Sequence, residues 1–104
     1  DGFVSDENGR IIGCTSPSVA TDGILTFPRS MDCTGIERNS LGGLEEEVIE
    51  VYIPSNITYI APGAFDHLHL LMFIEVAEDN PAYYSDDGIL YAADGEIIAY
   101  PGGR

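Results

Sequence analysis

The stretch IPSNITYIAPGAFDHLHLL, residues 53–71, combines residues that bend the backbone with residues that seek burial. It has too many apolar residues for a loop, and Pro54, Pro62 and Gly63 would interrupt a helix. Proline and glycine suit corners, whereas isoleucine, phenylalanine and leucine suit a core. The stretch therefore predicts one coil of a stacked structure, with its apolar side chains inward and Pro and Gly at its corners.

The preceding segment repeats this pattern. When residues 25–54 are laid over residues 51–76, Phe27-Pro28 falls on Ile53-Pro54. The other matches are Ile36 with Ile60, Leu41 with Phe65, Leu44 with Leu68, Ile49 with Ile74 and Val51 with Val76. The period is about 24 residues, with a two-residue insertion near Asp32 and Cys33 in the first copy. Self-similarity at such a period is typical of repeat proteins whose coils stack on one another.

Each copy also contains a segment with a period of two. Ile49, Val51 and Ile53 alternate with Glu50 and Tyr52, which predicts a strand with the three aliphatic side chains inward. Residues 74–76 repeat the alternation around Glu75. After each strand, the segment equivalent to Ala64–Leu71 has enough helix formers for a helical turn or two.

The two ends of the chain differ from the coils. Asn8-Gly9 lies between two apolar pairs near the N-terminus and predicts a short hairpin. Near the C-terminus, Asp94-Gly95 predicts the turn of a second hairpin, between residues 89–91 and 97–100. The fold class expected from the residues is mostly β with short helical turns and hairpin extensions. The C-terminal hairpin would either interrupt the stack of coils or cover one end of it.

The composition bounds the size and the partners of the protein. A chain of 104 residues is enough for one small domain, and it has no apolar run long enough to span a membrane. Its 18 acidic residues and 4 arginines, without lysine, give a net charge of −14. Nucleic acids and anionic membranes are therefore excluded as natural partners. Basic proteins, divalent cations or simple solubility remain as explanations of the charge.

Two cysteines allow two interpretations. Cys14 and Cys33 are 19 residues apart, without CxxC spacing and without a nearby histidine, so a metal site is disfavoured. The alternatives are a disulfide between them, or two buried thiols.

Three segments resemble a known family, the BspA-like leucine-rich repeats of bacterial surface and secreted proteins. IPSNITYIAPGAF is similar to the family's coil, and NPAYYSDDGILYAADGEIIAYPGG is similar to an insert that accompanies such coils. GRIIGCTSPSVATDGILTFP looks like the segment that precedes the first coil. The chain departs from the family at Ser40-Leu41, where Ala-Phe is usual, and at His67, where a cysteine or small polar residue is usual.

The resemblance implies a leucine-rich-repeat solenoid fragment that forms one domain over residues 1–104. Residues 1–23 would be an N-terminal extension, residues 24–76 about two coils, and residues 77–104 a C-terminal hairpin insert. It also implies an extracellular or cell-surface segment of a longer exported protein, which binds proteins without catalysis and without a cofactor. In some members of the family the partners are host extracellular-matrix or plasma proteins. No binding residue can be transferred, because the motif residues of the family are structural.

No catalytic or metal site is expected from the motifs. The chain lacks a GxSxG nucleophile motif and a glycine-rich phosphate loop. His67 and His69 would point to opposite sides of a strand, so we expect them to be exposed polar residues. The acidic runs 45–47, 78–79 and 86–87 lack the DxDxDG spacing of a calcium loop. We therefore expect a protein that is not an enzyme.

The alternation does predict a candidate partner-binding face. If the aliphatic residues of the strand are inward, Glu50 and Tyr52 face outward, and Glu75 lies beside them on the next coil. An exposed tyrosine bordered by carboxylates suits an interface with basic protein partners. We expect a binding or adhesion module, and the alternative is a purely structural spacer of a larger cell-surface protein.

Overall fold

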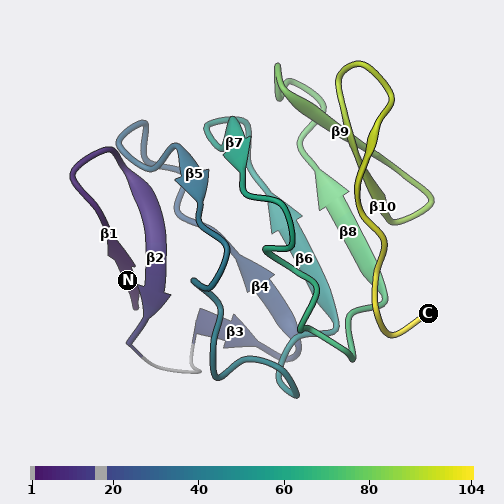
Figure 1. The fold of residues 1–104 in the computed structure, drawn as a ribbon, viewed down its shortest axis with the longest axis horizontal. Helices are drawn as coiled ribbons and strands as arrows, with labels where there is room; N and C mark the ends of the chain where they lie inside the picture. The colour runs from purple at the N-terminus through teal and green to yellow at the C-terminus, as the bar shows by residue number, and fades with distance from the viewer. Residues whose placement is uncertain (1, 16–18) are drawn as a thin grey trace.

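The computed structural model describes residues 2–15 and 19–104 and contains three β-sheets (Figure 1). The strands are β1 (Phe3–Ser5), β2 (Arg10–Cys14), β3 (Ala20–Thr21), β4 (Ile24–Thr26), β5 (Gly35–Ile36), β6 (Glu50–Ile53), β7 (Tyr59–Ile60), β8 (Phe73–Val76), β9 (Tyr83–Asp86), β10 (Ile89–Ala92) and β11 (Ile97–Ala99). The sheets have the strand orders β1-β2-β5-β7, β3-β4-β6-β8 and β11-β10-β9. The mostly β fold class is thereby confirmed.

The first two sheets are built mainly from parallel strands that succeed one another along the chain. In the β2-β5-β7 row, Ile11 pairs with Ile36, and Ile36 pairs with Ile60. In the β4-β6-β8 row, the corresponding buried residues are Leu25, Val51 and Ile74. All six side chains belong to one hydrophobic core. One coil is therefore one strand from each sheet with the turns that join them, and equivalent aliphatic residues pack on each other from coil to coil.

The register corrects the sequence alignment at one point. β6 pairs with β8 so that Val51 lies beside Ile74 and Ile53 beside Val76, not Ile49 beside Ile74 as predicted. Ile49 precedes the strand and is 50% exposed, so the prediction that it faces inward is wrong. Its side chain instead lies against the backbone of Gly23, where an added Cβ would be 3.1 Å from it. The predicted insertion is confirmed, because the offset from β4 to β6 exceeds that from β5 to β7 by two residues.

The turns after β5 and β7 are not helical. No α-helix occurs in residues 2–15 and 19–104, and the prediction of helical turns at Ala64–Leu71 is wrong. The backbone N–H of Leu68 donates to the carbonyl of Phe65, and that of Leu71 to the carbonyl of Leu68, each at 3.1 Å. These bonds span three residues, so the chain forms successive tight turns. Turning inward at every third residue buries Phe65, Leu68 and Leu71, which competes successfully with local helix propensity.

Both ends of the stack are covered, which is one of the two arrangements that the sequence left open for the C-terminal hairpin. β1 pairs with β2 and β3 with β4 in antiparallel hairpins on the N-terminal side. On the C-terminal side, the hairpin predicted around Asp94-Gly95 is present as β10 and β11, and β9 adds a third strand that the sequence did not predict. Figure 1 shows this sheet beside β8, at the end of the stack opposite β1.

The C-terminal sheet provides acceptors for the outermost coil. The hydroxyl of Tyr83 accepts a hydrogen bond from the backbone N–H of Ile60 at 2.8 Å. The hydroxyl of Ser85 accepts one from the N–H of Val76 at 3.0 Å. Burial raises the pKa of the Tyr83 hydroxyl, so this group stays neutral beside the core. The edges of β7 and β8 are thus closed by these two hydroxyls and by the backbone carbonyl of Gly88, which accepts from the N–H of Ile74 at 2.9 Å.

Two buried asparagines join the coils at the opposite corner. The side-chain amide nitrogen of Asn56 donates to the carbonyls of Pro28, Ser30 and Cys33 at 2.7–3.0 Å. Asn80 does the same one coil later, toward the carbonyls at positions 54 and 57. Asn56 begins the Asn-Ile-Thr sequence of a glycosylation acceptor, yet it is only 7% exposed. Its amide is therefore a structural donor in the folded protein.

We predict that Phe65→Ala lowers the free energy of unfolding by about 3–5 kcal/mol, because it removes a large buried ring from the core. Phe65 is 3% exposed and its ring lies 6.4 Å from that of Phe27. Urea denaturation followed by circular dichroism measures the change. Met31→Ala is the control, since Met31 is 80% exposed. Equal unfolding midpoints for the parent and Phe65→Ala would contradict the assignment of this core.

We also predict that Asn56→Ala costs about 1–3 kcal/mol of stability, because it leaves buried carbonyls without a donor. The same denaturation experiment measures the loss. Asn8→Ala is the matched control, since Asn8 lies in an exposed turn. If both variants unfold at the parental midpoint, the amide does not hold the coils together.

Candidate functional site

The outward side of the β4-β6-β8 sheet carries the residues predicted to form a partner-binding face. Thr26, Tyr52 and Glu75 form one row across the three strands. Ile24, Glu50 and Phe73 form the adjacent row. The burial of Val51 and Ile53, between the more exposed Glu50 and Tyr52, shows that the alternation along β6 is as predicted. We call these six outward residues the β4-β6-β8 face.

The structure therefore brings Tyr52 and Glu75 into direct cross-strand contact, with Glu50 in the adjacent row. Two members of this face were not predicted from the sequence, namely Ile24 and Phe73, which are 42% and 38% exposed. Their outward position follows from the strand register, because each pairs with Glu50. The register was missed because the alignment placed Ile49, and not Val51, beside Ile74. A role of the face in binding stays a prediction.

A cation and a shallow cavity lie beside Tyr52. The guanidinium carbon of Arg29 is 5.3 Å from the centroid of the Tyr52 ring, a cation–π distance. A cavity of about 200 Å³ lies next to this ring, and Met31 at its border is 80% exposed. The tyrosine is thus held in place on one side and accessible on another, which suits an anchoring residue.

The two histidines lie over the acidic run of the preceding coil. His67 Nε2 is 3.9 Å from a carboxylate oxygen of Glu45, and His69 Nε2 is 3.7 Å from one of Glu46. The second pair is exposed, as expected for His69. His67 is more enclosed than expected, because its Nε2 atom is buried without a hydrogen-bond partner. The two pairs connect successive coils, and each histidine faces a different glutamate.

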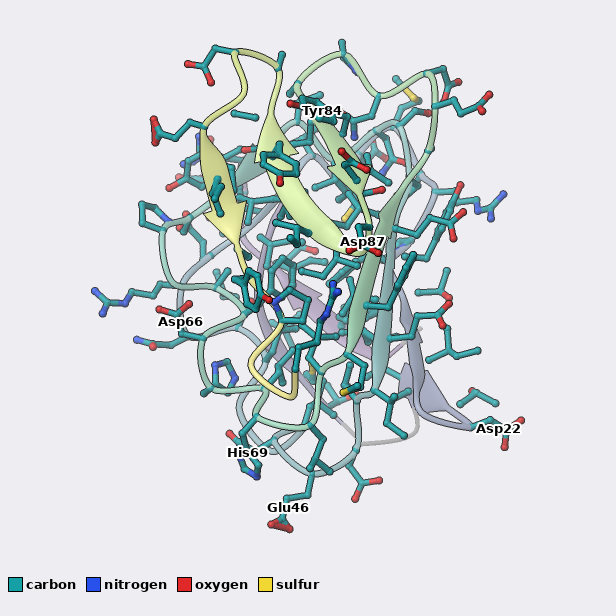
Figure 2. All side chains as sticks on the ribbon, turned by 90° about the vertical axis from the view of Figure 1, so that its right-hand side faces the viewer. Asp22, Glu46, Asp66, His69, Tyr84 and Asp87 are labelled. Carbon is teal, nitrogen blue, oxygen red and sulfur yellow. The ribbon has the colours of Figure 1, made fainter. Side chains whose placement is uncertain are left out.

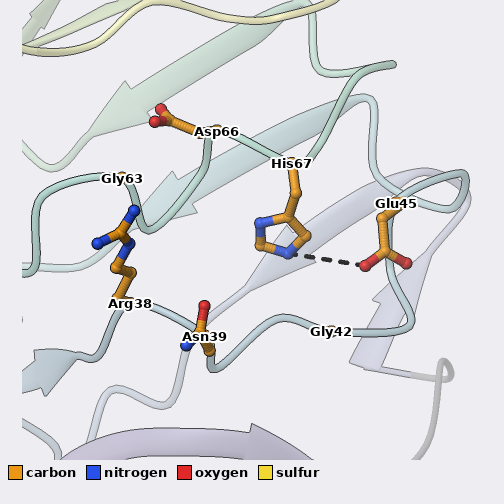
Figure 3. Close-up of a pocket in the computed structure, with 7 residues that line it drawn as sticks. All are labelled: Arg38, Asn39, Gly42, Glu45, Gly63, Asp66 and His67. Carbon is orange, nitrogen blue, oxygen red and sulfur yellow. Dashed lines mark ion pairs between the residues drawn. The ribbon is translucent and has the colours of Figure 1, made fainter.

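A polar cavity of about 330 Å³ surrounds the first pair (Figure 3). Its lining residues are Arg38, Asn39, Gly42, Glu45, Gly63, Asp66 and His67. Among the described residues, no three histidine, cysteine, aspartate or glutamate side chains gather as a metal site would require. The cavity has charged groups of both signs and no cysteine or serine that could serve as a nucleophile.

Glu45 is held by backbone donors. Its two carboxylate oxygens lie 3.0 and 3.2 Å from the backbone nitrogen of Gly43. Hydrogen bonds from its own backbone N–H and from that of Gly43 lower the pKa of the carboxyl group, and the nearby His67 and His69 act in the same direction. The acidic run is therefore in part a structural element of the turn.

The cysteines are separate free thiols, so the candidate disulfide between Cys14 and Cys33 is not formed. Arg10 pairs with Gly35 across the parallel strands β2 and β5. Cys14 thus lies four residues beyond this pair and Cys33 two residues before it, a separation of roughly 20 Å along the strands. Cys33 is buried, and the Cys14 thiol donates to the carbonyl of Ser40 at 3.5 Å. Burial raises the pKa of both thiols, which favours unreactive packing groups.

The described part of the chain has no helix of the length and hydrophobicity needed to cross a bilayer.

Comparison with known proteins supports the fold and no more than the fold. No family model and no curated protein matches the chain. A leucine-rich repeat protein from Eubacterium ventriosum superposes with a TM-score of 0.62 at 24% identity, over 74% of this chain and 20% of its own. The chain has a leucine-rich-repeat-like fold.

A leucine-rich cell surface protein from Faecalibacterium prausnitzii is also similar, with a TM-score of 0.55 at 23% identity. The match covers 83% of this chain and 29% of that protein. The chain therefore spans less than a third of the length of either structure.

We predict that the stabilising effect of Glu45 depends on pH. A carboxyl group whose pKa is lower in the folded state stabilises the fold above the unfolded pKa, and this contribution is lost as the pH falls through the folded pKa. Glu45→Gln should therefore unfold at less urea than the parent at about pH 7, with a smaller difference at about pH 3, because acid progressively neutralises the carboxylate. Glu47→Gln is the control, because Glu47 is exposed. A difference that is the same at both pH values would contradict the role assigned to the carboxylate.

Proposed function

We propose that this chain is a non-catalytic protein-binding module of an exported bacterial cell-surface protein. It would be a fragment of a BspA-like leucine-rich-repeat solenoid, and the β4-β6-β8 face would contact the partner. The partner class is extracellular protein with a basic patch, including host extracellular-matrix and plasma proteins.

The observation that carries the proposal is the composition of this face. Tyr52 lies opposite Glu75 on the neighbouring strand and two residues after Glu50 on its own strand. Ile24 and Phe73, on the two strands beside Glu50, add exposed aliphatic and aromatic carbon. Interfaces are enriched in aromatic residues, which provide buried contact area, and charged residues around them select the partner. A sheet that only separated other domains would not need exposed apolar side chains on the two strands that flank β6.

Electrostatics supports the choice of partner. The net charge of −14 attracts basic surfaces over a range of about 10 Å at moderate ionic strength. On the face itself, Arg29 is the one arginine that contacts a member, and its contact is with the Tyr52 ring. The two glutamates are thus free to pair with a partner's cations. The cell-surface description of one solved structure with this fold is consistent with an extracellular site of action.

The experiment is biolayer interferometry of the purified chain against immobilised extracellular-matrix and plasma proteins. At physiological ionic strength, we expect saturable binding to at least one of them. We expect Tyr52→Ala combined with Glu50→Lys to weaken it by at least about tenfold, the usual effect of losing an interface anchor. Glu7→Lys is the control, because it makes the same charge change at an exposed turn away from the face.

Binding that the double variant leaves unchanged would reject the β4-β6-β8 face as the contact surface. Binding that occurs at low salt alone, or no binding at all, would instead support a structural spacer whose charge serves solubility.

A further inference from the structure

The C-terminal sheet has an open edge at β11. This strand pairs with β10 on one side, and β10 pairs with β9 in turn. In residues 2–15 and 19–104, no hydrogen bond joins the other side of β11 to another segment. The edges of β7 and β8, by contrast, are closed by the hydroxyls of Tyr83 and Ser85 and by the backbone carbonyl of Gly88. An open edge presents backbone donors and acceptors on which another extended chain can pair.

A row of exposed apolar side chains leads to this edge. On the outer side of the sheet, Tyr84 pairs across the strands with Tyr91, and Tyr91 pairs with Ile97. The two tyrosine rings are stacked, with centroids 5.1 Å apart and planes at 13°. Tyr84 is 43% exposed and Ile97 is 57% exposed. Figure 2 looks onto this end of the molecule, with the sheet toward the viewer and Tyr84 labelled.

The row is incomplete at its outer end. Ile97 has Tyr91 on one side and, because β11 is the last strand, no cross-strand neighbour on the other. Opposed side chains on neighbouring strands stabilise a sheet, especially when aromatic or β-branched residues meet. A fourth strand would therefore extend the backbone ladder and complete the row at the same time.

The charge around this edge is of one sign. Residues 77–103 contain six carboxylates, and no lysine or arginine. Asp94 and Glu96, which are both exposed, lie at the turn that leads into β11. The arginine that follows this segment, Arg104, is already paired with Asp87. Arg104 also lies over the ring of Tyr100, just beyond the opposite end of β11. At the turn that leads into β11, a docking strand meets the carboxylates of Asp94 and Glu96, so a basic strand is favoured.

We propose that β11 is a docking edge for an extended, basic segment of a partner protein, which adds a fourth strand to the β9-β10-β11 sheet. The backbone of the segment pairs with β11, a β-branched or aromatic side chain lies beside Ile97, and flanking lysines or arginines face Asp94 and Glu96. This edge is separate from the β4-β6-β8 face, and the proposal does not depend on it.

The chemistry disfavours a second copy of this chain as the occupant. Two copies would bring net charges of −14 together. The four arginines of the chain are also far apart in sequence, at positions 10, 29, 38 and 104, so no segment of it is an alternating basic strand.

The test uses a fluorescein-labelled peptide of eight residues that alternates lysine and valine. Fluorescence anisotropy against the whole chain at about 0.15 M salt measures affinity. The comparison peptide keeps the four lysines but replaces alternate valines with proline, which removes backbone donors without changing the charge. We expect the first peptide to bind at least about tenfold more tightly than the second.

Two protein variants complete the design. Ile97→Lys places a cation on the edge and removes the apolar end of the row, so it should weaken binding by at least about tenfold. Ile12→Lys is the matched control, because Ile12 is 48% exposed on β2 and the charge change is the same. Both positions are exposed, so the thermal melts should match that of the parent. Backbone amide NMR shifts on binding should centre on residues 97–99.

Each contrary result would overturn the proposal. Equal affinity for the two peptides would show charge attraction without strand pairing. Equal weakening by Ile97→Lys and Ile12→Lys would show a nonspecific effect of net charge. Absence of binding, or amide shifts that centre away from β11, would show that the edge does not accept such a strand. Weaker binding of extracellular proteins by the variant that combines Tyr52→Ala with Glu50→Lys is a separate result, since that variant leaves β11 intact.

Discussion

The structure depends on hydrogen bonds that pass from each coil to the next, because a single coil cannot satisfy its own backbone. Parallel strands supply most of them, since every strand in the two long rows needs a neighbour above and below. At the corners after β4 and β6, the backbone turns and forms no strand pairs. There the side-chain amides of Asn56 and Asn80 donate hydrogen bonds to the backbone carbonyls of the preceding coil. A buried carbonyl without a donor is costly, so these corners fix how the coils sit on one another.

The division of each strand into inward and outward positions explains how so acidic a chain folds. Aliphatic side chains occupy the positions that face inward from each strand, and the carboxylates lie on turns or on outward strand positions. Where carboxylates lie close together in the acidic run, a backbone N–H group can stabilise the charge, as the N–H of Gly43 does for Glu45. The charge is therefore carried by the surface without interrupting the stack.

Much of the fold could be predicted from the sequence, because corners require Pro or Gly and inward positions require aliphatic residues, and both recur at a regular spacing. The terminal hairpins followed from Asn-Gly and Asp-Gly turns. The errors have physical causes. Ile49 continues the apolar alternation but lies before the strand, so the register was misplaced and Ile24 and Phe73 were missed. The structural role of Asn56 was not predicted, because it depends on carbonyls 23 to 28 residues away in the sequence. The third strand β9 was missed although Asp87-Gly88, both with positive φ, forms an Asp-Gly turn between β9 and β10. Its role in closing the stack depends on the edges that it covers.

The closure of the stack by Tyr83 and Ser85 bears on the mechanics of the protein. A continuous ladder resists sliding because its hydrogen bonds share the load. The C-terminal sheet is joined to the edges of β7 and β8 by scattered bonds instead, from the hydroxyls of Tyr83 and Ser85 and the carbonyl of Gly88. Under tension along the chain, we therefore expect the C-terminal sheet to detach before the parallel rows behind it separate. Detachment of the C-terminal sheet would expose the edges of β7 and β8, and their backbone groups could then pair with another strand, as we propose for β11.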